Sequence, residues 1–173
     1  MLTVPVQDFN TFTQEFYDSV IEKLEMHRIK CSCEHSGCLS FHARYERSVI
    51  TPSGKKVLTI WRVICSECRH THALLLSSIV PYNQIPAGTQ QEIAAAYEER
   101  SDRNELCSSG CGIDENNIKS VIRRYVKSWR ERLLSESISL LSLPDLISAC
   151  FSHYSKQFMQ IRNTCNKLVS FST

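Results

Sequence analysis

The chain has 173 residues, of which 42% are hydrophobic and 22% are charged, and its formal net charge is +2. This length suits one compact core, or a small metal-organised module plus a helical domain, and the composition is not that of a disordered chain. No apolar run approaches the roughly 18 residues of a membrane span, and the first residues lack the basic and apolar segments of a secretory signal, so we expect a cytoplasmic protein.

The N-terminal segment predicts an amphipathic helix from about Asp8 to Lys30. Asp8 or Asn10 is a suitable N-cap. The first 25 residues carry five acidic side chains and one basic side chain, so the segment is acidic. The apolar side chains recur at spacings of three and four and are expected to pack against the rest of the fold: Phe9, Phe12, Phe16, Val20, Ile21 and Leu24.

A β-hairpin is expected between Leu39 and Ile64. Apolar and polar residues alternate at the start of this segment, and residues 57–64 are rich in β-branched and aromatic side chains. Between the two runs, Pro52 sets φ for a turn and Gly54 accepts a positive φ.

The second half of the chain predicts helices. An apolar run at residues 73–80 precedes them. The first helix is expected to be capped by Thr89, the second by Asp114, and the third begins near Pro144, which suits a first turn. The second helix has the clearest amphipathic pattern, and it is expected to reach about Leu134.

Two cysteine clusters flank the expected hairpin and are the clearest chemical signal in the chain. The first contains Cys31, Cys33 and Cys38, and the second is the Cys-x2-Cys pair Cys65 and Cys68. Zinc takes four thiolates in a tetrahedral arrangement, and a hairpin would set the distance between two tight turns that supply them. Because the chain is expected to be reduced, we predict a structural Zn²⁺ site in a zinc ribbon, with all five cysteines as candidate ligands.

The upstream cluster offers three thiols for two places, so any two of them could be the ligands. A catalytic zinc would need an open coordination position, which four thiolates would close. Buried cysteines without metal are the alternative interpretation. Three histidines are close enough in sequence to replace a thiolate or to donate to one: His35, His70 and His72. The remaining cysteines are not expected to bind metal: Cys107, Cys111, Cys150 and Cys165.

The helix expected after Asp114 carries a basic stripe. Residues 119–132 hold six basic side chains and one acidic side chain. Such a concentration predicts a polyanionic partner, and with the preceding helix it would give a helix-turn-helix-like arrangement that contacts DNA. Nearby acids such as Glu98 could instead neutralise it. The candidate nucleic-acid-binding residues are Lys119, Arg123, Arg124, Lys127 and Arg130.

The hairpin offers a second basic surface, in which aromatic residues are interleaved with cations that could contact phosphates. No nucleophile–base motif, phosphate-binding loop or dinucleotide fingerprint occurs, so we expect no enzyme and no small-molecule substrate. The residues of this surface are Arg44, Tyr45, Arg47, Lys55, Lys56, Trp61 and Arg62.

Several motifs in the segment from Cys31 to Tyr82 resemble those of a known family. They are Cys33, Cys38, Tyr45-Glu46-Arg47, Arg62 to Cys68, Thr71 to Leu75, and Ile79 to Tyr82. The segment resembles a family of small uncharacterised bacterial proteins related to mobile elements, whose zinc ribbon is similar to that of some insertion-sequence transposases. Arg69 and Leu76 depart from the pattern, where glycine and proline are expected. The nuclease domain of such transposases has no counterpart here, so the resemblance implies a stand-alone DNA-binding protein.

Together these observations predict an α+β fold with an N-terminal amphipathic helix (1–30), a zinc-ribbon domain (31–85) and a helical, helix-turn-helix-like domain (86–173). The expected function is that of a zinc-binding, DNA-binding accessory or regulatory protein related to bacterial mobile elements, without a catalytic domain. The alternative is a protein–protein interaction module, or an inhibitor, that binds a protein partner through the ribbon and the basic helix.

Overall fold

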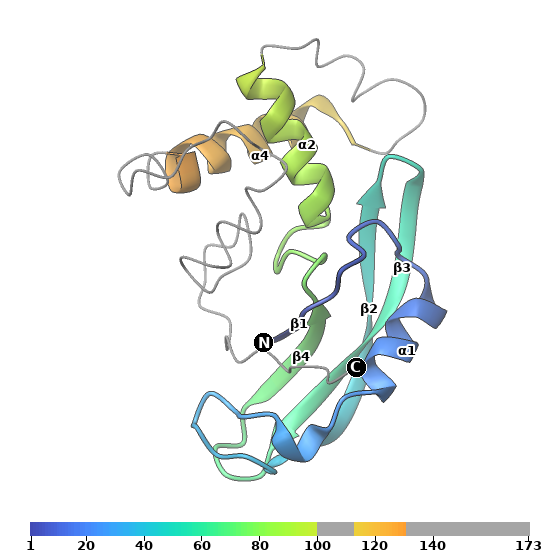
Figure 1. The fold of residues 1–173 in the computed structure, drawn as a ribbon, viewed down its shortest axis with the longest axis vertical. Coiled ribbons are helices and arrows are strands. Elements are labelled where there is room, and N and C mark those ends of the chain that lie inside the picture. Colours follow the sequence, from blue (N-terminus) through green and yellow to red (C-terminus); the bar gives the residue numbers. More distant parts are fainter. Residues whose placement is uncertain (100–112, 131–173) are drawn as a thin grey trace. The chain divides into compact units, whose positions relative to one another are not determined.

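The computed structural model describes residues 1–99 and 113–130, which form the expected α+β fold (Figure 1). They divide into two units: one contains residues 1–48 and 56–78, and the other contains residues 49–55, 79–99 and 113–130. The helix expected near Pro144 lies outside the described residues, as do the four cysteines from Cys107 onward. No helix in the described ranges is long and apolar enough to cross a membrane.

The expected hairpin is confirmed. Strand β2 (Leu39–Thr51) and strand β3 (Gly54–Cys65) are joined by a two-residue connection. Gly54 has φ of 114°, a conformation that favours glycine. Thr51 closes this turn, because its hydroxyl donates to the carbonyl oxygen of Gly54 at 2.9 Å.

Two further strands extend the hairpin to a four-stranded sheet of order β1-β4-β3-β2. Strand β4 (Thr71–Leu76) is antiparallel to β3, with Val63 opposite His72. Strand β1 (Leu2–Val4) runs parallel to β4, with Leu2 opposite Leu74. The sequence did not indicate β1, because three residues are too few to establish an alternating pattern.

The buried side chains of β3 change phase along the strand. Leu58 and Ile60 are buried, and the next buried positions are Val63 and Cys65, so the alternation slips by one residue between Ile60 and Val63. In a strand, a slip of one residue exchanges the two faces. The slip therefore turns Cys65 toward the interior at the end of the strand.

Helix α1 (Gln14–Glu22) supplies hydrogen bonds where β3 and β4 part. The paired part of the β3–β4 ladder ends with Arg62 opposite Ala73, and the same register would place Trp61 opposite Leu74. Instead, the buried hydroxyl of Tyr17 accepts from the backbone N–H of Trp61 at 2.8 Å and donates to the carbonyl oxygen of Leu74 at 2.9 Å. The Gln14 amide likewise pairs with both backbone groups of one β3 residue, Thr59.

Helix α1 is shorter than the expected span from Asp8 to Lys30. Thr13 is its N-cap, with Oγ1 accepting from the N–H of Phe16 at 3.2 Å. Asp8 instead accepts from two backbone N–H groups in the preceding turn, which satisfies those donors outside a helix. The helix ends at Glu22, and a separate 3₁₀ turn, η1, covers Met26–Arg28.

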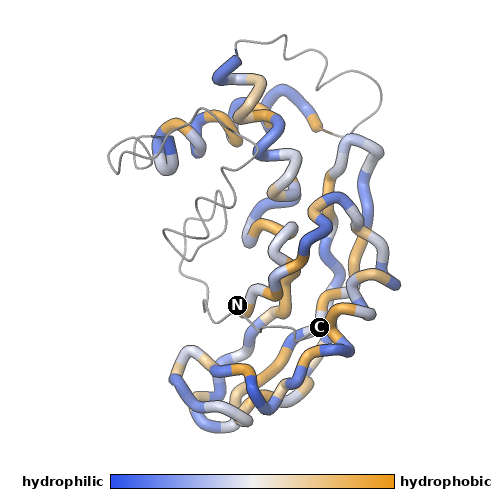
Figure 2. The backbone as a smooth tube through the Cα atoms, in the orientation of Figure 1, coloured by the Kyte–Doolittle hydropathy of each residue, from blue (hydrophilic) through white to orange (hydrophobic). Residues whose placement is uncertain are grey.

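In the second unit, helix α2 (Ala87–Glu98) begins after Pro86, so Thr89 lies inside the helix and is not its cap. Helix α4 (Glu115–Tyr125) is capped by Asp114, as expected, and continues as a π-helical turn, η2 (Val126–Arg130). Figure 2 shows hydrophobic and hydrophilic residues alternating along α4. The buried side chains of these helices include Ile93, Ala94, Ile118, Val121, Tyr125 and Trp129.

Candidate metal centre and nucleic-acid interface

Four of the five candidate cysteines converge at one point. The Sγ atoms of Cys31, Cys33, Cys65 and Cys68 all lie within 4.8 Å of one another, and these cysteines are free thiols. Cys31 and Cys33 lie in the loop before β2, Cys65 is the last residue of β3, and Cys68 lies in the loop that follows. These two loops are at the strand ends remote from the hairpin connection, and they lie side by side at the lower end of Figure 1. The hairpin therefore joins two segments that are more than thirty residues apart in sequence.

The first loop makes a tight turn around Cys31 and Cys33. The N–H of Glu34 donates to the carbonyl oxygen of Cys31 at 2.9 Å, and the N–H of Cys31 donates to the carbonyl oxygen of His35 at 3.0 Å. Glu34, which follows the second cysteine, has φ of 71°. This left-handed residue reverses the chain after the second thiol.

The second loop repeats this arrangement around Cys65 and Cys68. The N–H of Arg69 donates to the carbonyl oxygen of Cys65 at 3.0 Å, and the N–H of Cys65 donates to the carbonyl oxygen of His70 at 3.0 Å. Arg69 has φ of 60°, so it adopts the conformation for which a glycine is expected. The two cysteine turns therefore match, although one has a single residue between its cysteines and the other has two.

The distances between the sulfurs fit a tetrahedral ion. An ion that binds four sulfurs at about 2.3 Å holds neighbouring sulfurs about 3.8 Å apart. The Sγ atoms of Cys31 and Cys68 are 3.6 Å apart, and those of Cys33 and Cys65 are 3.7 Å apart. Both pairs connect one turn with the other, so an ion at the centre would link the two turns.

Cys38 lies beside this cluster but is not one of the four converging thiols. Its Sγ donates to the carbonyl oxygen of His35 at 3.2 Å. Its backbone carbonyl accepts from the N–H of Ser66 at 2.8 Å, which joins the start of the hairpin to its end. Burial and the neighbouring Cys65 raise the pKa of the Cys38 thiol to about 11.

The hydrogen bonds within the cluster favour one thiolate in each turn. For Cys65, burial opposes ionisation, but donors that include the N–H of Cys68, 3.5 Å away, lower its pKa to about 6. For Cys31, burial is likewise outweighed by hydrogen bonds from Cys33 and Cys68, and the pKa is lowered. For Cys68, the N–H of His70 favours the thiolate, but burial and the neighbouring thiols outweigh it and raise the pKa to about 12.

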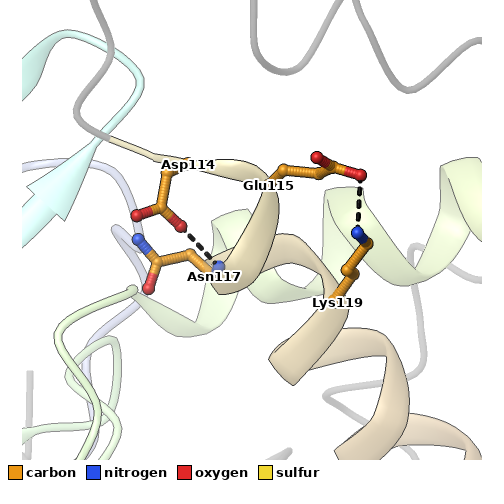
Figure 3. A network of polar contacts seen from close by, with 4 residues as sticks. All are labelled: Asp114, Glu115, Asn117 and Lys119. Atoms are coloured by element: carbon orange, nitrogen blue, oxygen red, sulfur yellow. Dashed lines mark hydrogen bonds and ion pairs between the residues drawn. The ribbon is translucent and has the colours of Figure 1, made fainter.

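The basic residues of α4 and η2 fall into two groups. Lys119 pairs with Glu115 at 2.7 Å (Figure 3), and Arg130 pairs with Glu98 of α2 at 2.7 Å. Glu98 also accepts from the Tyr125 hydroxyl at 3.1 Å, so this one carboxylate links α2 to both α4 and η2. The other three have no carboxylate within ion-pair distance in the described part of the chain: Arg123, Arg124 and Lys127.

These observations define an α+β protein with a four-cysteine site that could hold a metal ion. The chain belongs to the family described as a domain of unknown function (DUF6431), whose model matches residues 30–125, more than half of the chain. The matched segment contains all four converging cysteines, strands β2 to β4, and helices α2 and α4. No curated protein and no solved structure matches the chain.

Proposed function

We propose that this chain is a cytoplasmic, zinc-stabilised DNA-binding protein, an accessory or regulatory factor related to bacterial mobile elements, without a catalytic domain. Its two cysteine turns would form a zinc ribbon. Four thiolates in a tetrahedral arrangement suit Zn²⁺ and exclude the oxygen-seeking ions Mg²⁺ and Ca²⁺. Four protein ligands also leave no position for a reactive water, so the role of the ion is structural.

The ion would hold the open end of the hairpin together. Both thiols of each turn lie close to a thiol of the other turn, at 3.6 Å in one pair and 3.7 Å in the other, and without a cation these sulfurs would repel one another as they ionise. Zinc binding removes that repulsion and cross-links two segments that are distant in sequence. Its binding energy therefore contributes directly to folding.

The observation that supports DNA binding is a group of three cations on one helix that have no acidic partner among the described residues. Arg123 and Lys127 are exposed, and Arg124 is half-buried beside them. Phosphate groups attract such side chains without regard to sequence, and each contact releases bound counterions. These three residues would supply the principal phosphate contacts.

Lys119 would contribute at the edge of the same surface. Its ion pair with Glu115 joins two side chains that are more than half exposed, so solvent screens it strongly. A phosphate can therefore replace the carboxylate. Arg130 would have a different role, because its partner Glu98 is largely covered and anchors α4 against α2.

Helices α2 and α4 would form the helix-turn-helix-like pair, with α4 as the DNA-contacting helix. Helix α2 ends at Glu98 and α4 begins at Glu115, so the connection is longer than the three- or four-residue turn of the common motif. The proposal therefore depends on α4 as a basic surface and does not require the geometry of the common motif.

The experiment is duplex-DNA binding across a salt series with the zinc-loaded full-length protein. The double variant Arg123→Gln/Lys127→Gln should weaken binding to every duplex. It should also reduce the slope of log affinity against log salt by about 1.8, because each neutralised phosphate contributes about 0.9 to that slope. The matched control, Lys23→Gln/Arg28→Gln, removes two positive charges from exposed positions in the other unit. It should leave the slope unchanged.

Two results would contradict the proposal. The first is a wild-type protein without measurable duplex affinity at low salt, which would favour a protein partner for the basic helix. The second is an equal loss of affinity in both double variants, because binding would then follow net charge and not the surface of α4.

A further inference from the structure

A second surface with nucleic-acid chemistry lies on the hairpin, within the unit that contains the cysteine turns. The guanidinium carbon of Arg44 lies 4.7 Å from the centroid of the Trp61 ring and 5.7 Å from that of Phe41. The two aromatic rings are 5.3 Å apart and inclined at 73°, an edge-to-face contact. We call these three residues the aromatic–arginine cluster.

This cluster is open to solvent. Phe41 is 55% exposed, Arg44 is exposed and Trp61 is half-buried. Most large apolar side chains of this unit are buried, so an exposed phenylalanine beside a partly exposed tryptophan is unusual. The exposed apolar surface of these two rings contributes less to stability than it would if it were buried. Exposed aromatic residues in contact with an arginine are typical of a binding surface.

The charge of the hairpin identifies the kind of partner. Residues 39–65 contain five basic side chains and one acidic side chain, Glu46. Within the described residues, Arg44 has no carboxylate at ion-pair distance, and its guanidinium group lies against the two aromatic rings. A surface that combines flat aromatic groups with an exposed arginine and a net positive charge is complementary to a ligand with flat bases and a negative backbone.

We propose that the aromatic–arginine cluster binds single-stranded DNA, with unpaired bases stacked on Arg44, Phe41 and Trp61. The inference deepens the proposed DNA-binding function, because it assigns a second form of DNA to a different surface. In a duplex, base faces are hidden in the stack, so only unpaired bases can lie against these side chains. Basic side chains along the hairpin would then contact the phosphates between stacked bases.

The stacking geometry requires no rearrangement of the hairpin. The guanidinium group already covers one face of Trp61, and Arg44 is itself exposed. Arginine planes and aromatic rings both accept stacked bases, and such stacking is tolerant of base identity. The cluster should therefore bind single strands with little sequence preference.

The test compares an oligothymidylate of about 12 nucleotides with a duplex of the same length, using full-length zinc-loaded protein and fluorescence anisotropy. Phe41→Leu keeps an apolar side chain but removes the ring, and it should weaken single-strand binding by about 5- to 150-fold. Arg44→Gln should weaken it to a similar extent. Both variants should leave duplex binding within about twofold, because the duplex is assigned to α4.

Val57→Ala is the matched control. Val57 is 52% exposed on the same hairpin, but it has no ring on which a base can stack. A direct contact can also be measured, because the chain has two tryptophans and Trp129 is buried in the other unit. In the Trp129→Phe protein, which retains Trp61, the single strand should quench the remaining fluorescence.

Each outcome separates this inference from the proposed function. Single-strand binding that is unaffected by Phe41→Leu and Arg44→Gln, or that leaves the Trp61 fluorescence unchanged, would overturn the inference. So would absence of single-strand binding by a protein that still binds duplex. A protein that binds the single strand but not the duplex would refute the role of α4 and leave the inference intact. Equal losses with Val57→Ala would indicate general damage to the hairpin and would also contradict the inference.

Discussion

The Nε2 atom of His72 lies 3.2 Å from the Sγ atom of Cys31, and both side chains are buried. His72 is held opposite Val63 in the β3–β4 ladder, so the strand pairing fixes the position of its ring against the cysteine cluster. Burial lowers the pKa of His72, which keeps the imidazole neutral at pH 7. A neutral imidazole with its proton on Nε2 would donate to the Cys31 thiolate and stabilise it as a ligand.

We expect His72→Ala to weaken zinc binding by about 10- to 100-fold while the stoichiometry stays at one ion per chain. The reason is that the variant removes a donor to a ligand and leaves all four thiols in place. Competition with a chromophoric chelator measures the affinity. His70→Ala is the control, because the His70 side chain is exposed. Complete loss of stoichiometric binding in His72→Ala would show that His72 is itself a ligand.

Replacing single cysteines should distinguish the four converging thiols from the fifth. A change outside the ligand set is expected to weaken zinc binding by at most about 100-fold. Cys33→Ser should weaken it by more than that, because it removes a ligand. Cys38→Ser should retain one tightly bound ion, because the Cys38 sulfur faces the carbonyl of His35. The same chelator competition measures both variants. A Cys38→Ser protein that loses zinc while Cys33→Ser retains it would refute this assignment.

Zinc affinity should rise with pH across the neutral range. Cys65, with a pKa of about 6, is ionised at pH 7, whereas Cys33 and Cys68 have raised pKa values and must each release a proton when zinc binds. Release of at least two protons corresponds to a gain in affinity of at least about a hundredfold per pH unit. Below about pH 6, protonation of Cys65 should make the dependence steeper.

Chelator competition at a series of pH values checks this dependence. The slope should be the same in Cys38→Ser, because the raised pKa of Cys38 does not enter the binding equilibrium. An affinity that does not change between pH 6 and pH 8 would contradict thiolate ligation.

Tyr17→Phe should destabilise the protein by about 1–3 kcal/mol, the cost of leaving buried polar groups without a partner. The groups in question are the N–H of Trp61 and the carbonyl oxygen of Leu74, which the hydroxyl joins. Urea denaturation of the zinc-loaded protein measures the free energy of unfolding. Tyr45→Phe should change it by less than about 0.5 kcal/mol. Equal effects of the two variants would contradict the bridging role of Tyr17.

The hairpin was predictable because its signals are local. Alternation at the start of the first strand, β-branched and aromatic residues in the second, Pro52 at the turn and Gly54 at a positive φ all lie within the segment that they determine. The cysteine clustering was also visible in the sequence. Which two of Cys31, Cys33 and Cys38 join the metal site could not be predicted. That choice depends on the left-handed Glu34, which turns the chain back after the second thiol.

Other features depend on contacts between distant segments. Strand β1 forms by pairing with β4, more than sixty residues away, and its three residues carry no pattern of their own. The separation of Arg130 from the rest of the basic stripe depends on Glu98, which reaches it from another helix. From the sequence, Glu98 is one of several acids that could pair with the basic stripe. The packing of α2 against α4 determines that Glu98 is the one that pairs with Arg130.

The metal content of full-length protein, purified under reducing conditions without chelators, tests the zinc site most directly. Elemental analysis should find one zinc ion per chain, and it should find none in the Cys65→Ser/Cys68→Ser double variant, which lacks one of the two cysteine turns. A wild-type protein that folds without metal, or that holds iron in place of zinc, would contradict the zinc assignment. Zinc that persists in the double variant would contradict the four-cysteine site.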